Sequence, residues 1–140
     1  MTLDLTSLRK SIESLDNSIN SYMVNKENKS LSDIDMETLK AGVIQNFEVA
    51  YELCWKFLKR WLSLNVSPNI ADGVYRRELF RICAEHRLIF DVDIWMSYHE
   101  ARNLTSHTYD SVSAEKVFET SLVFIHDAKI LFETLEVKNG

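Results

Sequence analysis

Apolar residues recur every three or four positions over most of the chain, the spacing that places side chains on one face of a helix. One such stripe runs through residues 5–22, and a second, wider one through residues 39–62. Between them Ser32 precedes Asp35 by three residues, which predicts a capping box, with Asp in place of Glu, at the start of a long helix over 33–64. A stripe this wide predicts contacts with more than one neighbouring helix.

Three further helices are predicted downstream. The third spans residues 74–88, and the fourth spans residues 94–105 with Asp91 or Asp93 as its N-cap. Ser113 is the predicted N-cap of the fifth, whose apolar face continues almost to the end of the chain. The pattern therefore predicts an all-α, antiparallel up-and-down bundle of four to five helices.

Composition agrees with this class. The chain has 3 Gly and 1 Pro, too few for the turns of a many-stranded β fold, and its 140 residues fit one helical-bundle domain over 1–140. The net charge of -5 argues against a surface that coats nucleic acid generally, but it permits a local basic site. The N-terminus does not resemble a signal peptide and no window reaches membrane-spanning length, so we expect a cytoplasmic protein with no membrane association. Cys54 and Cys83 are expected to be buried free thiols.

The stretch ARNLTSHTYD brings four chemically active side chains close together: Arg102, Asn103, His107 and Tyr109. In one unbroken helix Arg102 and His107 would point about 140° apart, because five residues advance about 500°. They can converge only if the helix ends near Thr105, or if a second copy of the chain supplies one of them across a two-fold axis.

Arginine and histidine together suit phosphodiester chemistry. Arginine stabilises the negative charge that develops on a phosphoryl group, and histidine moves a proton to or from a ribose hydroxyl. This scheme uses neither a metal ion nor another cofactor, and no helical ligand spacing such as HExxH predicts a metal site. The alternative stays open that Arg102 and His107 merely complement the dipole at a helix C-terminus.

Other charged residues could line or support this site. Glu48 and Glu52 lie four residues apart on one face of the long helix, where they could bind Arg76 or Arg77, or face Arg102. An arginine-rich stretch could be either a phosphate-binding patch or a solvated helix face; it contains Arg76, Arg77, Arg81 and Arg87. His99, three residues before Arg102, either joins the site or is an ordinary surface histidine.

Two segments resemble a known family. The long helix contains IQNFEVAYELCWK, and the fourth helix leads from Trp95 through Glu100 into RNLTSHTY. Both are similar to motifs of the HEPN-like nucleotidyltransferase substrate-binding proteins, and the similarity covers about residues 39–110. The chain departs from the family in one place, because Arg87 stands where a glycine is expected at the end of the third helix.

The resemblance implies a dimeric helical bundle that works with a minimal nucleotidyltransferase encoded nearby. HepT-type relatives are metal-independent endoribonuclease toxins, whose R-x4-H-x-Y motif forms a composite cleft across the dimer, and the nucleotidyltransferase adenylylates the tyrosine. This implies catalytic roles for Arg102 and His107 and modification of Tyr109. Supporting roles then fall to the remaining candidates, Asn103, Glu48, Glu52 and Glu100.

Two other functions remain possible at this point. The chain could be a non-catalytic subunit that binds a substrate or nucleotide for the nucleotidyltransferase, or a plain helical scaffold. The ribonuclease hypothesis predicts an open groove at the dimer axis. Burial of Arg102 against Glu48, Glu52 or Glu100 with no opening would argue against phosphate binding.

Overall fold

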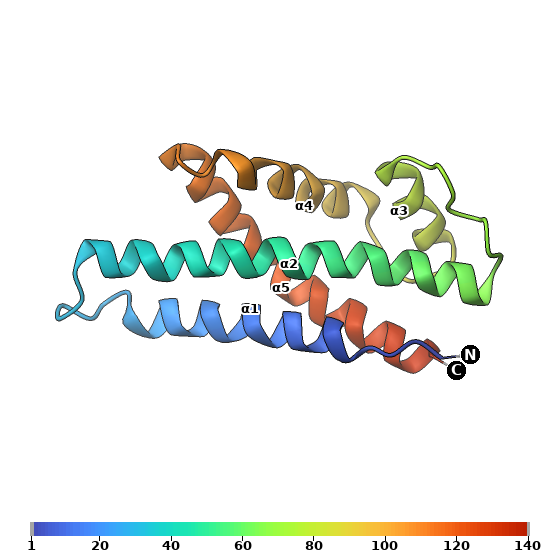
Figure 1. Ribbon diagram of the computed structural model, residues 1–140, viewed down its shortest axis with the longest axis horizontal. Helices are drawn as coiled ribbons and strands as arrows, with labels where there is room; N and C mark the ends of the chain where they lie inside the picture. The colour runs from blue at the N-terminus through green and yellow to red at the C-terminus, as the bar shows by residue number, and fades with distance from the viewer. Residues whose placement is uncertain (1, 140) are drawn as a thin grey trace.

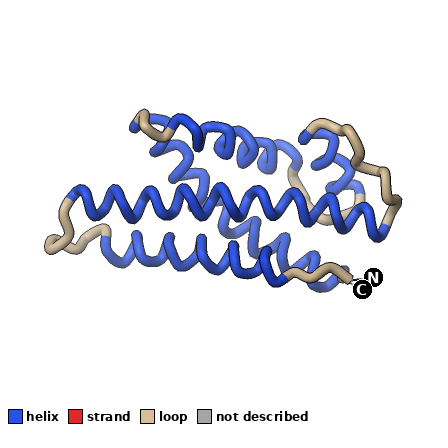
Figure 2. Tube along the Cα trace, in the orientation of Figure 1, coloured by secondary structure: helices blue, strands red, loops and turns tan. Residues whose placement is uncertain are grey.

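The computed structural model describes residues 2–139, and all the regular elements in that range are helices (Figure 2). The predicted all-α class is therefore confirmed. The elements are α1 (Thr6–Asn25), α2 (Asp33–Asn65), α3 (Arg76–Glu85), α4 (Val92–Leu104), the short 3-10 helix η1 (Thr105–His107) and α5 (Ser111–Lys138).

Helix α2 is the centre of the arrangement. It runs antiparallel to α1, with α4 along its other side and α5 crossing behind it (Figure 1). The short helix α3 packs near the C-terminal end of α2 and against α4. Contacts with all four other α-helices explain the wide apolar stripe of α2, as the sequence predicted.

An aromatic cluster fastens α2, α4 and α5 together in the core. The Phe124 ring of α5 lies 5.1 Å from Phe47 of α2, 5.1 Å from Tyr98 and 5.9 Å from Trp95 of α4, measured between ring centroids. All three pairs meet edge to face, the geometry that aromatic quadrupoles favour. This cluster fixes the position of α4 relative to α2, and the motif follows at the end of α4.

The helix starts are set by short polar side chains. The capping box of α2 is present as predicted: the Ser32 hydroxyl accepts the N–H of Asp35, and the Asp35 carboxylate accepts the N–H of Ser32, both at 3.1 Å. Of the two candidates for α4, the cap is Asp91, whose carboxylate accepts the N–H of Ile94 at 3.0 Å.

The predicted cap of α5 was wrong. Asp110, not Ser113, is the N-cap, and its carboxylate accepts the N–H of Val112 at 3.1 Å. The Ser113 hydroxyl instead donates to the other oxygen of Asp110 at 3.1 Å. A carboxylate can accept from a backbone N–H and a hydroxyl together, so α5 begins earlier than the serine predicts.

Helix α3 is shorter than the predicted 74–88 at both ends: Tyr75 is an extended N-cap before its first residue, and Arg87 leaves the helical conformation after its last. Arg87 has φ 60°, in the left-handed region, and Leu88 donates its N–H to the carbonyl of Cys83 at 2.9 Å. Arg87 itself donates to Ala84 at 3.0 Å, which completes a Schellman motif. This is the geometry for which helix ends favour glycine, and Arg87 adopts it in the absence of one.

Both cysteines are free and buried, as predicted. Burial raises the pKa of the Cys83 thiol to about 12, and it raises that of Cys54 as well. Thiols of this kind stay protonated near neutral pH and act as small apolar groups in the core.

We expect Arg87→Gly to stabilise the protein. A non-glycine residue in the left-handed region costs about 1 kcal/mol, and glycine removes that cost, so the free energy of unfolding should rise by about 0.5–1 kcal/mol. Urea denaturation followed by circular dichroism measures this. Arg87→Ala is the matched control, since it removes the same side chain but keeps the strain; an equal gain in both variants would contradict the explanation.

Candidate functional site

The motif lies where α4 ends and turns toward α5, at the end of the molecule opposite the chain termini (Figure 1). Helix α4 stops at Leu104, and the Thr105 hydroxyl donates to the carbonyl of Arg102 at 2.7 Å. The Thr108 hydroxyl donates in turn to the carbonyl of Thr105 at 3.3 Å. These side chains satisfy carbonyls at the helix end, and the regular helix ends near Thr105. This meets one of the two conditions under which Arg102 and His107 could converge.

Arg102 faces α2, where it meets two carboxylates. Its Nε donates to Oε1 of Glu52 at 2.7 Å, and its Nη2 lies 3.6 Å from Oε1 of Glu48. Glu48 and Glu52 therefore face Arg102, which was one of the predicted alternatives. Arg77, another predicted partner, forms an ion pair with Asp93 at 2.8 Å. The Arg102 side chain remains 31% exposed. Because its two ion pairs engage Nε and Nη2, the Nη1 group is left for another acceptor.

His107 and Tyr109 form a second, separate group. Both are exposed, and their rings lie 6.2 Å apart in an edge-to-face arrangement. Within residues 2–139, no hydrogen bond or ion pair joins either of them to Arg102. Asn103 and Glu100 are exposed on α4. One chain therefore brings Arg102 together with its glutamates, but it does not bring Arg102 and His107 into contact.

A polar network extends from Glu52 toward α3. The second oxygen of Glu52 accepts from Nε1 of Trp55 at 3.1 Å, and the Arg76 guanidinium lies over the Trp55 ring at 3.5 Å from its centroid. Close by, the Tyr51 hydroxyl is 3.0 Å from Nδ1 of His99. His99 is thus part of a network beside the site and not an ordinary surface histidine.

The protonation of this network follows from burial and charge. Burial lowers the pKa of His99, and the nearby Arg76 guanidinium lowers it further, so the imidazole is neutral at pH 7. Burial raises the pKa of Tyr51, which keeps the phenol protonated. The protonated phenol and the neutral imidazole therefore share one hydrogen bond, between the Tyr51 oxygen and Nδ1 of His99.

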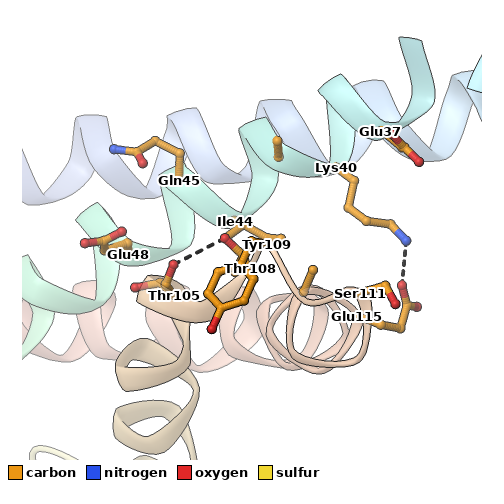
Figure 3. A pocket seen from close by; sticks show the side chains of 12 residues that line it. Glu37, Lys40, Ile44, Gln45, Glu48, Thr105, Thr108, Tyr109, Ser111 and Glu115 are labelled. Atoms are coloured by element: carbon orange, nitrogen blue, oxygen red, sulfur yellow. Dashed lines mark hydrogen bonds and ion pairs between the residues drawn. The ribbon is translucent and has the colours of Figure 1, made fainter. Parts of the chain in front are cut away.

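A cavity of about 550 Å³ opens between α2 and the start of α5 (Figure 3). Tyr109 and Thr108 line it from the loop, and an ion pair between Lys40 and Glu115 spans one side. Three carboxylates reach its wall, those of Glu37, Glu48 and Glu115, against the single lysine. This balance of charge disfavours a phosphate inside the cavity and suits a neutral or cationic group.

Nothing in the sequence indicates this cavity, because its walls come from residues 37–48 and 105–115, which only the fold brings together. Tyr51 and Trp55 were also missed as parts of the site, since both fit the apolar stripe of α2. One signal was available: Glu48 and Glu52 interrupt that stripe, and a carboxylate on a largely apolar face requires a partner.

Two kinds of feature are absent from the described part of the chain. Within residues 2–139, no three His, Cys, Asp or Glu side chains gather closely enough to hold a metal ion. Over the same range, no helix combines the length and the apolar character needed to cross a membrane.

Comparisons with known proteins give consistent matches. A family model described as nucleotidyltransferase substrate binding protein like matches residues 3–137. A Haemophilus influenzae protein named probable ribonuclease HepT is 36% identical over 107 residues, which are 76% of this chain and 73% of that protein.

Solved structures agree with these matches. A Haemophilus influenzae structure, described as the fold of a substrate binding domain of a nucleotidyltransferase, is 30% identical and has a TM-score of 0.89, covering 95% of this chain and 99% of that one. A Thermus thermophilus crystal structure is 20% identical with a TM-score of 0.62, covering 86% of this chain and 98% of that one, and is similar in fold alone.

The His99 network should make stability depend on pH. Because the pKa of His99 is lowered in the folded state, the unfolded chain binds the proton more readily, and stability falls as pH drops below about 6.5. Between about pH 7.5 and pH 5, His99→Gln should lose less stability than the wild type in chemical denaturation. His126→Gln, at an exposed histidine of α5, should behave like the wild type. Equal losses in all three proteins would exclude this role for His99.

Proposed function

The chain belongs to the family of nucleotidyltransferase substrate binding protein-like proteins, and from this we propose that it is the HEPN-type subunit of a two-component minimal-nucleotidyltransferase system, acting as a metal-independent endoribonuclease toxin. The observation that carries the proposal is Arg102, a partly exposed guanidinium fixed by Glu52 and Glu48 with one edge left for a ligand. The similarity to a protein named as a ribonuclease supports it.

The reaction needs only the groups of the motif. The ribose 2′-oxygen attacks the adjacent phosphorus as neutral His107 takes its proton, and Arg102 stabilises the charge that develops on the phosphoryl oxygens. The bond to the 5′-oxygen breaks, and that oxygen receives the proton from the imidazolium. The products are a 2′,3′-cyclic phosphate and a 5′-hydroxyl. Asn103 and Glu100, both on α4, would help to hold the RNA or orient these groups.

A homodimer would complete the site. In one chain Arg102 is turned toward α2, whereas His107 is exposed and has no bond to it. A two-fold axis beside the motif would let each chain supply Arg102 to one site and His107 to the other. Val112, which is 74% exposed at the start of α5, offers apolar surface next to the motif for burial against the second copy.

The purified protein should cleave single-stranded RNA in EDTA, and Arg102→Ala or His107→Ala should each lower the rate by about 100-fold or more. His126→Ala, which removes an exposed histidine far along α5, is the matched control and should cleave like the wild type. Intact RNA with the wild type, together with normal growth of cells that express it, would contradict the ribonuclease proposal.

Mixing the two inactive variants tests the composite site. Co-expressed Arg102→Ala and His107→Ala chains should recover about a quarter of the wild-type activity, because about half of the dimers are mixed and each mixed dimer has one intact site of two. No recovery would show that both groups act from the same chain.

A second candidate is a non-catalytic subunit that binds a substrate or nucleotide for the nucleotidyltransferase. Two observations favour a substrate-binding role: the cavity beside Tyr109 is large enough for a small neutral or cationic molecule, and one similar structure is described as a substrate binding domain. On this hypothesis the chain co-purifies with the nucleotidyltransferase, Arg102→Ala lowers the partner's activity, and the chain itself leaves RNA intact.

Tyr109 should be the residue that the nucleotidyltransferase modifies, because its phenol is 88% exposed beside the catalytic pair. Incubation with the nucleotidyltransferase and ATP should add adenylyl groups to the wild type but not to Tyr109→Phe, as measured by intact-protein mass spectrometry. Tyr75→Phe is the matched control, since Tyr75 is 89% exposed but distant in sequence from the motif. Modification that persists in Tyr109→Phe would place the target elsewhere.

A further inference from the structure

Arg76, the first residue of α3, has an unusual environment. Its Nη1 is the one buried side-chain nitrogen or oxygen in residues 2–139 that has no hydrogen-bond partner. Its neighbours on α3 have carboxylate partners, Asp93 for Arg77 and Glu78 for Arg81, but Arg76 has no such ion pair in the described chain. The positive charge of this guanidinium is therefore not neutralised by a direct ion pair within the described chain.

Stacking holds Arg76 in position without using its Nη1 group. The guanidinium lies over the Trp55 ring at 3.5 Å from its centroid, and the Trp55 Nε1 donates to Glu52. A guanidinium stacked on an aromatic face keeps its donors in the plane of the group, where a phosphate can accept two of them. Nη1 itself is buried, but the Arg76 side chain as a whole is only half-buried, so an acceptor from solvent would meet the accessible part of the group and not Nη1.

The same network joins Arg76 to the candidate site. Glu52 binds Arg102 with one oxygen and Trp55 with the other, and His99 is close enough to both arginines for each to lower its pKa. Arg102 alone faces two carboxylates, Glu48 and Glu52, which leaves one negative charge in excess. Arg76 balances that excess, so an anion can approach the site without net repulsion.

We propose that Arg76 forms a second phosphate-binding subsite, which holds an RNA backbone phosphate next to the scissile one. The inference rests on the proposed ribonuclease function. Its chemistry is that of a guanidinium, held in place by stacking, that donates charge-assisted hydrogen bonds to a phosphodiester oxygen. Arg76 takes no part in bond cleavage; it determines where the RNA strand lies relative to Arg102 and His107.

The salt dependence of RNA binding tests the subsite. The parent is His107→Ala, which binds without cleaving, and the probe is a short fluorescent single-stranded RNA titrated over a series of KCl concentrations. Each lost phosphate contact lowers the slope of log Kd against log salt by about 0.7 for single strands. Arg76→Gln should show this reduction together with weaker binding. Arg77→Gln, the same change at the next residue, should match the parent.

The outcomes separate the two proposals. If Arg76→Gln keeps the slope of the parent while Arg102→Ala lowers it, the subsite is wrong and the proposed function stands. If the parent binds no RNA at any salt concentration, both are wrong. Should Arg76→Gln fail to fold by circular dichroism, Arg76→Lys decides: weaker binding at an unchanged melting temperature supports the subsite, and unchanged binding overturns it.

Discussion

Glu52 is the acceptor on which the geometry of the candidate site depends. One of its oxygens binds Nε of Arg102 at 2.7 Å, and the other binds Nε1 of Trp55 at 3.1 Å. The carboxylate therefore fixes the last full turn of α4 against the middle of α2, and it orients the indole on which Arg76 stacks. A charge-assisted hydrogen bond in a half-buried place is stronger than one in open solvent, so this single side chain holds two cationic groups in defined positions.

The end of α4 divides the motif into two parts with different surroundings. Arg102 belongs to the helix and is held by packing and charge, whereas His107 and Tyr109 lie beyond the helix end and are exposed. An arginine that must stabilise charge gains from a fixed position, because preorganised donors need no rearrangement during the reaction. On the proposed function Tyr109 has the opposite requirement, because an enzyme would have to reach it, and its side chain is 88% exposed.

Much of the fold could be predicted from periodicity and capping residues, because both depend on neighbours within one or two turns. The stripe of α2 and the cap at Ser32 are of this kind. The predicted C-terminal end of α3 lies beyond the observed one. A glycine at position 87 would have indicated the left-handed turn, but an arginine does not. The pairing of Arg102 with Glu52 was one of several open alternatives, because it depends on how α4 lies on α2. The placement of Arg76 on Trp55 depends in the same way on the docking of α3.

The two ends of the described chain are joined by a reciprocal clasp. The Asn139 amide accepts the N–H of Leu3 and donates to its carbonyl, both at 2.8 Å. Because its two ends lie side by side, the chain could be joined there and opened elsewhere without moving the five α-helices relative to one another. A short linker across Leu3 and Asn139, with a new break in the loop between α1 and α2, would give a permuted chain that begins with α2, and its aromatic core and motif would keep their present neighbours.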